Sequence, residues 1–447
     1  MAASAPPILP NAPIEAEDNR PAKLGLWMSI ALVTGGMIGS GVFLLPASLA
    51  PFGWNAVAGW GMTIAGALCL AHVIARLTAA DSGQIGPAEL VARSFGPVAG
   101  FLIGFSYWVS VWAATATISI GAVSYASSFV PVLGLHPALS ATGVIWMLTL
   151  VNLIGTRVAG SFQLVTTLLK LLPLIVVALL IALVLGQQGS AAITPFPAEG
   201  LSWARINQAA AITLWAMVGF EAACAASGRI ANPARNVPRA TVVGALLCGV
   251  IYLIVCSGIA LMLPADRVAV SNAPFELFVA TFWSAGPAAL VGLFAAISAV
   301  GAVNGWILVQ GELPYDMAQR QLMPRWFGKA AANGVPVRAV LVASLLATLL
   351  VWANSSRSMA GLFTFMALLT TSVTLWLYLA CALVALKRRM AIPTACAGLA
   401  YGLWALWGAG LEASGLSVVL MLAGLPLYWI ARREGPDGNK TSAVLRP

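Results

Sequence analysis

Long apolar stretches, separated by short polar connections, recur along almost the whole chain. They are continuous and about 20 residues long, the length an α-helix needs to cross a bilayer, whereas barrel strands alternate over about 10 residues. The pattern predicts an all-α polytopic membrane protein with about twelve transmembrane helices and no separate folded domain outside the membrane. The predicted spans are 26–50, 55–79, 98–130, 138–156, 162–186, 207–227, 239–263, 281–313, 338–353, 359–386, 392–411 and 415–431.

Spans one and six are interrupted near their centres. In span one, the segment ALVTGGMIGSGVFLLP at 31–46 places four glycines and a serine where a helix is least able to hold itself together. In span six, ITLWAMVGFEAACAASG at 212–228 contains Gly219 and the acid Glu221. Paired interruptions in corresponding halves of a chain are typical of transporters with a substrate site at mid-bilayer. Both helices are therefore predicted to be broken.

The two interruptions also predict the domain organisation. Each opens a block of five spans, and since five is odd, the second block enters the membrane from the opposite side, as an inverted repeat requires. Repeats at about 23–187 and 207–390 form the predicted transport core, followed by two accessory helices at 391–431. Residues 1–22 are predicted to be a disordered cytoplasmic tail, because they lack the cationic start and apolar run of a signal peptide. Residues 432–447 form a second cytoplasmic tail.

The composition supports a membrane protein. Of the 447 residues, 60% are hydrophobic and only 8% are charged, whereas a soluble domain averages about a quarter charged residues. The net charge of +9 does not indicate nucleic-acid binding, because Lys and Arg lie almost wholly between alternate spans. With the N-terminus inside, 19 of the 23 cationic residues are cytoplasmic, three lie outside and one lies within a span. This bias predicts a multi-pass inner-membrane protein with both termini in the cytoplasm.

No catalytic or metal-binding pattern is present in the sequence. The six cysteines lie in apolar stretches without CxxC or CxxH spacing, and two histidines are too few for a metal site. HExxH, GxSxG and P-loop motifs do not occur. We therefore predict no metal, no cofactor and no enzymatic activity.

A helix that is interrupted at mid-membrane leaves free N–H groups at the start of its second half and free C=O groups at the end of its first half. In span one, the N–H groups around Ser40, Gly41 and Val42 are predicted to face an anionic group such as a carboxylate. Ser40 adds a hydroxyl group. The alternative is that these glycines merely allow two helices to pack closely.

The carbonyl groups near Met37, and those of Trp215 and Val218 in span six, are predicted to face an ammonium group. Together with the N–H groups of span one, they describe a site for a zwitterionic amino acid. The substrate class therefore follows from the backbone at the two breaks, before any side chain is considered.

Three segments carry a resemblance to a known family: GGMIGSGVFLLP at 35–46, LWAMVGFEAACAASGRIANPARNVPRAT at 214–241 and NGWILVQGELPYDMAQRQLMP at 304–324. They resemble the amino acid/polyamine/organocation superfamily, and most closely its basic amino acid and polyamine antiporters of the arginine/agmatine type. The resemblance extends over about residues 24–390. It implies a leucine-transporter type of fold, with two inverted five-helix repeats plus two further helices, often as a homodimer.

The resemblance implies that Trp215 and Trp306 enclose the substrate's side chain. An indole face attracts a cation by about 0.5 to 2 kcal/mol, depending on desolvation. A Trp alone is more often a packing residue or an interfacial anchor, and the chain contains 16 of them. Only their positions in the matching motifs single these two out.

Glu221 is implied to act as a gate or a proton-linked acid. A charge at mid-membrane costs roughly 2.5 to 3.5 kcal/mol on insertion scales, and an unpaired buried acid tends to be protonated. The alternative is a structural acid that bonds to the backbone left open by the break.

Span three is implied to form another wall of the site. In FSYWVSVWAATATISIG, Tyr107 is implied to be an outer lid, and Ser110 and Val111 to line the pocket. Thr115 replaces an asparagine that arginine/agmatine antiporters use on the guanidinium group. This replacement leaves arginine specificity open.

Lys170 lies in the otherwise apolar segment FQLVTTLLKLLPLIVV, where a basic residue needs an acid, carbonyl groups or a change of protonation. Here the chain is similar instead to proton-coupled permeases and sodium-independent exchangers, in which the ammonium group stands in for sodium by bridging spans one and eight to span five. The alternative is a lysine that reaches the lipid headgroups.

The sequence thus predicts an amino acid/polyamine antiporter that works by alternating access. The predicted partners are an amino acid or amine substrate, membrane lipids, protons and a second copy of the chain. A proton-coupled or exchange-type permease for neutral amino acids is the alternative, favoured by Lys170 and Thr115. A nutrient receptor that does not transport is more remote, and measurable flux distinguishes it from both.

Overall fold

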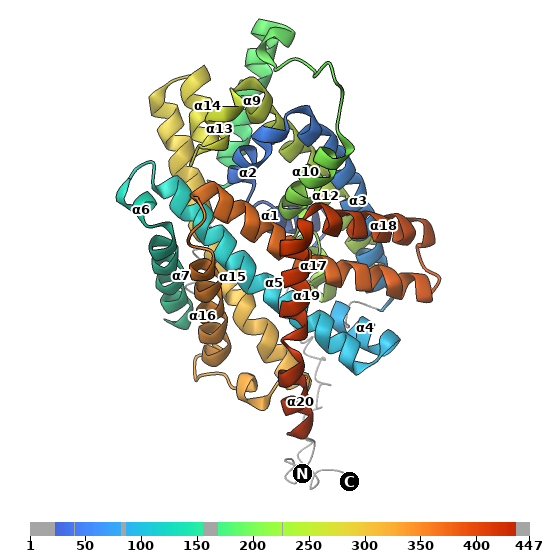
Figure 1. The fold of residues 1–447 in the computed structure, drawn as a ribbon. Coiled ribbons are helices and arrows are strands. Elements are labelled where there is room, and N and C mark those ends of the chain that lie inside the picture. The colour runs from blue at the N-terminus through green and yellow to red at the C-terminus, as the bar shows by residue number, and fades with distance from the viewer. Residues whose placement is uncertain (1–22, 40, 82–85, 155–168, 226, 435–447) are drawn as a thin grey trace, which may run out of the picture.

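The structure, a computed structural model, describes residues 23–39, 41–81, 86–154, 169–225 and 227–434 (Figure 1). Within these residues the chain is almost entirely helical and contains no β-sheet. A single isolated bridge joins Leu24, ahead of the first helix, to Ile230, after the second break. The prediction of an all-α protein is confirmed.

Twelve of the helices, in chain order, cover the first half of the chain and the start of the second. They are α1 (Leu26–Met37), α2 (Gly41–Leu49), α3 (Trp54–Ala80), α4 (Pro87–Phe95), α5 (Pro97–Ala126), α6 (Val132–Leu135), α7 (Pro137–Ile154), α9 (Leu171–Gln188), α10 (Trp203–Met217), α11 (Ala222–Ala225), α12 (Pro233–Met262) and α13 (Ala265–Ala269). The remaining helices are α14 (Pro274–Phe282), α15 (Ala285–Gln319), α16 (Val337–Ala353), α17 (Met359–Lys387), α18 (Ile392–Gly408), α19 (Gly410–Leu422) and α20 (Leu425–Arg433).

Each predicted span has a helical counterpart in the described chain. Eight helical segments are long and apolar enough to cross a membrane, and the bent pair formed by α1 and α2 makes nine. The other three predicted spans correspond to the shorter helices α10, α16 and α18. The multi-pass membrane architecture is therefore confirmed.

Several helix limits differ from the predicted spans, because hydropathy marks the apolar part of a helix and not its end. α15 continues to Gln319, beyond the predicted limit of 313, and an ion pair of 2.9 Å between Asp316 and Arg320 supports its last turn. α12 starts at Pro233 and not at 239, and α5 ends at Ala126 and not at 130. The short helices α4, α13 and α14 were not predicted, since they lie outside the spans.

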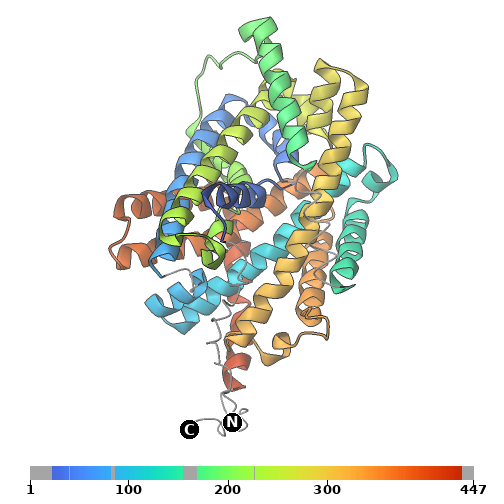
Figure 2. The ribbon, with the colours of Figure 1, turned by 180° about the vertical axis from the view of Figure 1, so that it is seen from behind.

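Among the helices long enough to cross a membrane, α5 and α17 are the most buried, with 72% and 83% of their most apolar segments inside the protein, compared with 28% for α7 and α9. α5 packs against α15 and α17, while α3 packs against α10 and α12. In the rear view, the dark-blue α1 lies near the centre of the molecule, where it packs against α12 (Figure 2). The broken helices are thus surrounded by longer, continuous ones.

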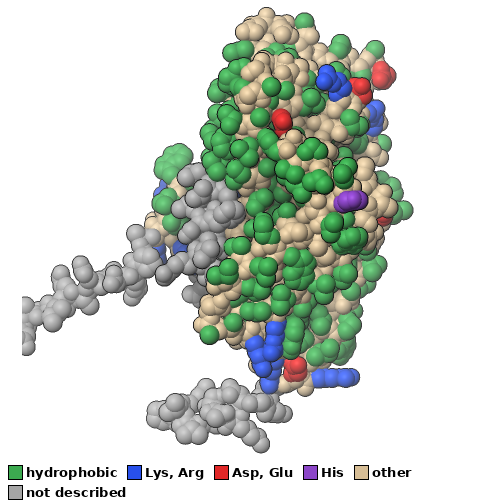
Figure 3. All heavy atoms as spheres, turned by 90° about the vertical axis from the view of Figure 1, so that its left-hand side faces the viewer, with side chains coloured by type: hydrophobic (Ala, Val, Ile, Leu, Met, Phe, Trp, Pro, Cys, Tyr) green, Lys and Arg blue, Asp and Glu red, His purple; other side chains and the backbone are tan. Residues whose placement is uncertain are grey.

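Charged side chains lie toward the two ends of the molecule on the face shown in Figure 3, with a broad hydrophobic belt between them. At one end, Arg388 pairs with Asp81 at 2.6 Å and Arg320 with Glu89 at 2.8 Å, so each pair joins helices that are distant in sequence. Arg93 and Lys387, which the sequence also assigns to the cytoplasm, lie at this cation-rich end as well, where Arg93 pairs with Glu89 and Lys387 bonds to the Ser94 carbonyl. The belt is the surface expected to face lipid.

The predicted accessory helix α18 docks on the transport core, against α3, α10 and α17. The Tyr401 hydroxyl donates to Thr63 Oγ1 at 3.1 Å, and Asn207 Nδ2 donates to the Trp404 carbonyl at 2.7 Å. The Tyr401 ring lies directly over Gly66 of α3, where any side-chain carbon would overlap it. A small residue at Gly66 therefore allows the two helices to approach closely.

We expect Gly66→Val to destabilise the protein by roughly 1 to 3 kcal/mol, because the new side chain overpacks the contact with Tyr401. Thermal unfolding of the purified protein in detergent measures the effect. Gly61→Val is the matched control, since Gly61 lies on the same helix and is exposed, with no atom near its added carbon. Equal losses in both variants would mean that helix propensity, and not the α3–α18 contact, sets the cost.

Candidate functional site

The two predicted breaks lie against each other. α1 ends at Met37 and α2 starts at Gly41, with an angle of 53° between the two halves. After α10 the backbone turns at Gly219, whose φ is +110°, a value that favours glycine. A side-chain carbon on Gly219 would lie 3.0 Å from the Gly36 carbonyl oxygen. The interruptions of spans one and six are therefore confirmed, and glycine permits their close contact.

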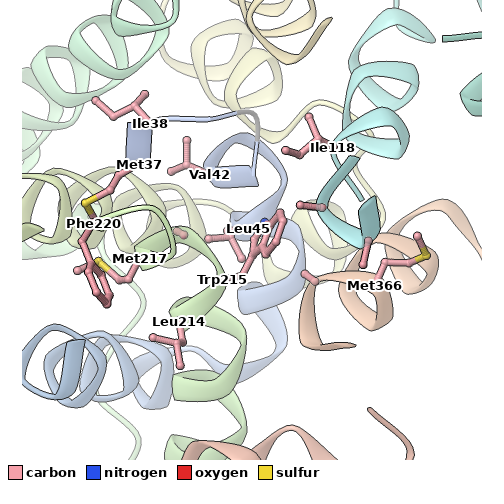
Figure 4. Packing of buried hydrophobic residues seen from close by; sticks show 14 of the residues in the cluster. Met37, Ile38, Val42, Leu45, Ile118, Leu214, Trp215, Met217, Phe220 and Met366 are labelled. Carbon is pink, nitrogen blue, oxygen red and sulfur yellow. The ribbon is translucent and has the colours of Figure 1, made fainter. Parts of the chain in front are cut away.

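A small cavity of about 30 Å³ lies between the two breaks. Its walls come from both broken spans and from α5 and α15, and Figure 4 shows several of these side chains. The lining residues are Gly36, Met37, Gly39, Gly41, Val42, Ile118, Trp215, Ala216, Val218 and Trp306. Six of these are residues that the sequence proposed for the substrate site: Met37, Gly41, Val42, Trp215, Val218 and Trp306.

The cavity is too small for an amino acid. A buried water needs about 10 to 15 Å³ of such space, so the cavity has room for about two waters. The Trp215 indole fills part of the region beside α2, because a side-chain carbon on Gly41 would overlap Trp215 Nε1. That nitrogen is buried and has no hydrogen-bond partner among the described residues. The structure therefore shows a form without room for an amino acid, which we call the closed form, in which Trp215 covers the start of α2.

The start of α2 supplies the predicted N–H groups. The first four N–H groups of a helix have no partner within it, and in α2 they begin near Gly41 and Val42, both of which are buried and line the cavity. Ser40, whose hydroxyl group was also predicted to face the substrate, lies outside the described residues. On the facing side, the Trp215 carbonyl accepts a hydrogen bond from the Val218 N–H at 3.3 Å. Of the three carbonyl groups predicted to bind an ammonium group, that of Trp215 is therefore already engaged in the closed form.

Glu221 is held by three donors. Tyr107 donates its hydroxyl to Oε1 at 3.2 Å, Tyr378 donates to Oε2 at 2.9 Å, and the Gly219 N–H donates to Oε2 at 3.2 Å. Its side chain is buried, so these bonds replace water around the carboxyl group. Glu221 thus joins the second break to α5 and α17. Tyr378 was not among the predicted residues. A tyrosine within an apolar span needs a hydrogen-bond partner, which could have indicated a contact with the buried acid.

Tyr107 was expected to be an outer lid, a role that the predicted orientation of the chain does not support. Tyr107 lies in the first half of α5, whose start adjoins Ser94, and the Ser94 carbonyl accepts a hydrogen bond of 2.5 Å from Lys387. This is the cation-rich end of the molecule, and the predicted orientation makes it cytoplasmic. Tyr107 is then on the inner side of the cavity. A motif match gives a residue a role, but the direction in which its helix crosses the membrane sets its depth.

The other predicted residues of span three do not line the cavity. Ser110 donates to the Tyr107 carbonyl at 2.7 Å, and Val111 is fully buried in packing. Thr115 donates to Gln310 Oε1 at 3.0 Å, which turns its hydroxyl toward α15. Ile118, one helical turn further along α5, lines the cavity instead. Of the α5 residues, the cavity is thus lined by Ile118, one turn beyond Thr115 and about two turns beyond Ser110 and Val111.

Gln310 belongs to a buried polar chain that the sequence analysis did not find. Its Nε2 donates to Ser344 Oγ at 2.8 Å, and this hydroxyl lies 2.7 Å from Thr149 Oγ1. With Thr115, these hydrogen bonds link α5, α15, α16 and α7. Buried side-chain amides need such partners, because an unmet donor or acceptor costs about 1 to 3 kcal/mol. The chain of bonds therefore holds α15, which carries Trp306, against α5, α16 and α7.

Lys170 immediately precedes α9 and is only 5% exposed. Its ammonium group donates a hydrogen bond to the Gly35 carbonyl in the last turn of α1, beside Gly36 of the cavity. This burial does not match a lysine that extends to the headgroups, and the contact joins span five to the broken end of span one. The implied bridge to span eight is not among the hydrogen bonds of Lys170 in the part of the chain described.

A family model for amino acid permeases matches residues 24–434. The cadaverine/lysine antiporter of Escherichia coli (strain K12) is 32% identical over 345 residues, covering 76% of each chain. The putrescine transporter PotE of Haemophilus influenzae is 28% identical over 423 residues, 91% of this chain and 96% of the relative. The putrescine transporter PotE of Escherichia coli (strain K12) is 26% identical over 433 residues, 94% of this chain and 98% of the relative.

The fold and the paired breaks define a polytopic membrane transporter. The chain belongs to the amino acid permease family, within the amino acid/polyamine/organocation superfamily. It is a transporter and not an enzyme. Its substrate is a small molecule.

We expect Gly219→Ala to destabilise the protein by about 1 to 2 kcal/mol, because alanine is strained at positive φ and its side chain would press on the Gly36 carbonyl. A lowered midpoint of thermal unfolding in detergent is the readout. Gly228→Ala serves as the control, since Gly228 follows the same break in open space with ordinary φ. A variant as stable as the wild type would contradict the close contact of the two breaks.

Proposed function

We propose that this permease is a secondary active antiporter that exchanges a basic amino acid for a polyamine by alternating access across the inner membrane. The observation that carries the proposal is the pair of broken helices that meet at one closed cavity between Trp215 and Trp306. The names of the relatives, which state lysine, cadaverine and putrescine, support this substrate class. The cation bias of the loops supports a cytoplasmic location for both termini.

The substrate carboxylate binds the N–H groups at the start of α2, around Ser40, Gly41 and Val42. A helix N-terminus carries about half a positive charge, and its effect is largest where water is excluded. Trp215 covers this helix start in the closed form, so its indole has to move aside when substrate enters. The rotation of one side chain therefore controls access to the anion-binding end of the site.

The substrate amino group binds the carbonyl groups of Met37, Trp215 and Val218. The Trp215 carbonyl gives up its bond to the Val218 N–H, which at 3.3 Å is long and readily replaced by an ammonium donor. The backbone at the second break then changes shape when substrate binds. This differential contact is the source of the free energy that shifts the transporter between states.

The side chain of the substrate lies between Trp306 and Ile118, with Trp215 above it. No charged side chain is present among the residues that line the cavity. A cationic side chain is therefore bound through the indole faces, as the resemblance implies. The α5 wall is supported by residues that pack outside the cavity, namely Ser110, Val111 and Thr115.

Glu221, Tyr107 and Tyr378 form the inner closure. Their hydrogen bonds tie the second break to α5 and α17, so opening toward the cytoplasm has to separate at least two of the three side chains. Protonation of Glu221 weakens its acceptor bonds, which makes it the proposed proton-linked acid.

A proton-coupled or exchange-type permease for neutral amino acids is the second candidate. The contact of Lys170 with the Gly35 carbonyl favours it, because a fixed ammonium group at the broken end of α1 replaces the cation that other transporters take up. Thr115 also turns its hydroxyl toward Gln310 and does not line the cavity, so a guanidinium group in the cavity does not meet it.

We also propose the partners of the transporter and the limits of its transport core and tails. Protons couple to transport through Glu221 or Lys170, membrane lipids surround the apolar belt, and a second copy of the chain forms a homodimer. The transport core consists of inverted repeats at 23–187 and 207–390, with 391–431 as accessory helices. Residues 1–22 and 432–447 are the proposed cytoplasmic tails.

Counterflow in proteoliposomes tests the function. Vesicles are loaded with unlabelled cadaverine, and uptake of labelled lysine is measured with a panel of unlabelled amino acids and polyamines as competitors. Saturable uptake, competed by basic amino acids and diamines, supports the antiporter. Parallel vesicles loaded with unlabelled leucine measure uptake of labelled leucine, and saturable leucine flux without lysine flux supports the second candidate. The absence of flux in both assays would indicate a receptor.

Trp306→Ala should weaken the binding of a cationic substrate about 2-fold to 30-fold more than the binding of a neutral one, because only a cation loses the attraction of the indole face. Counterflow half-saturation values for lysine and leucine provide the comparison. Trp407→Ala is the control, as this Trp is 80% exposed and does not line the cavity. Equal losses for both substrates would assign Trp306 to packing.

Lys170→Ala should shift the pH profile of uptake or hold the transporter in one conformation, because the Gly35 carbonyl loses its donor. Initial rates of uptake measured from acid to alkaline pH report the change. Lys329→Ala, at an exposed position, should leave the profile as in the wild type. An unchanged profile in the Lys170 variant would make its contact with α1 purely structural.

A further inference from the structure

A groove of about 430 Å³ lies at the cation-rich end of the molecule, apart from the substrate cavity. It is formed by the start of α5, the loop that follows α15, and α20, which is labelled below α19 in Figure 1. Its lining residues are Pro97, Arg320, Gln321, Leu322, Met323, Arg325, Tyr428, Ala431 and Arg432. We call this the α20 groove.

The α20 groove is lined by three arginines and by no acidic side chain. Acids do lie nearby: Arg320 bonds to Asp316 and Glu89 at 2.9 and 2.8 Å, and Glu434 accepts a bond of 2.6 Å from the backbone N–H of Arg325. Two ion pairs occupy only part of the five N–H donors of the Arg320 guanidinium. The wall of the groove therefore still offers donors to an anion.

Tyr428 provides an independent observation. Its side chain is 3% exposed and its hydroxyl has no hydrogen-bond partner among the described residues, although it lines the α20 groove. The guanidinium group of Arg432 lies 5.2 Å from the centre of its ring. Buried hydroxyl groups are nearly always satisfied, so an acceptor is expected opposite this one.

Two exposed tryptophans indicate the depth of the groove in the membrane. Trp429 follows Tyr428 and is 61% exposed, and Trp326 follows Arg325 and is 47% exposed. Tryptophans gather where the bilayer meets water, because the indole has an apolar body and one polar N–H group. The groove thus opens at the level of the lipid headgroups.

We propose that the α20 groove binds the phosphate group of an anionic lipid headgroup. Guanidinium groups and a hydroxyl donor match the several acceptor oxygens of a phosphate, and basic pockets between helices on the cytoplasmic side are typical sites for such headgroups. Arg432 and Arg320 contact the phosphate oxygens, and the Tyr428 hydroxyl donates to one of them. The occupant is a lipid and not a free phosphate ion, because the groove opens at headgroup level.

Native mass spectrometry of the full chain in detergent, titrated with phosphatidylglycerol, cardiolipin or phosphatidylcholine, tests the proposal. The wild type should retain the two anionic lipids in preference to phosphatidylcholine. Arg432→Gln should reduce this retention about fivefold, the effect of one cation near a headgroup. Arg433→Gln is the matched control, because Arg433 lies on the same exposed turn but does not line the groove. It should bind as the wild type does.

Tyr428→Phe removes only the unpartnered hydroxyl and should reduce retention up to about tenfold. A parallel titration with inorganic phosphate distinguishes the two sources of the anion. Millimolar phosphate that fails to displace the lipid supports a headgroup site. Equal losses in Arg432→Gln and Arg433→Gln, undiminished binding in Tyr428→Phe, or displacement of the lipid by phosphate alone would overturn the proposal.

Discussion

The absence of water in the bilayer core is the constraint on which this structure depends. Every backbone N–H and C=O group at that depth has to find a partner within the protein, so a helix can be broken only where other helices enclose the gap. Here the two gaps enclose each other, and the contact between Gly219 and the Gly36 carbonyl brings them together. The long helices α5 and α17 lie around them and are the most buried of the helices long enough to cross a membrane.

The same constraint explains why the two ionisable side chains nearest the gaps, Glu221 and Lys170, are both engaged. The carboxyl group of Glu221 accepts bonds from two tyrosines and one amide, and the ammonium group of Lys170 donates to the Gly35 carbonyl. Both groups therefore stabilise the closed form while remaining chemically able to change partners. A side chain that is fully satisfied in one state, and that has to exchange its bonds in the next, links a local event to a motion of whole helices.

The cavity and the helix packing around it are linked through α5 and α15. Thr115 bonds to Gln310, Gln310 bonds to Ser344, and the Ser344 hydroxyl bonds to Thr149, so this chain of bonds joins the helix that carries Trp306 to its neighbours. The cavity itself is lined mainly by apolar side chains and backbone. The positions of these lining side chains therefore depend on the buried polar chain behind them.

The sequence by itself determined the membrane class, the twelve apolar spans and the two breaks, because hydrophobicity and glycine content act locally along the chain. It also identified six of the residues that line the cavity, since these belong to the broken segments themselves. Only the tertiary structure decided that Ile118 and not Thr115 faces the cavity, that Tyr107 lies on the side of Glu221, and that Tyr378 completes the cluster. Those facts depend on the rotation and depth of one helix relative to another, which side-chain packing across the whole bundle sets.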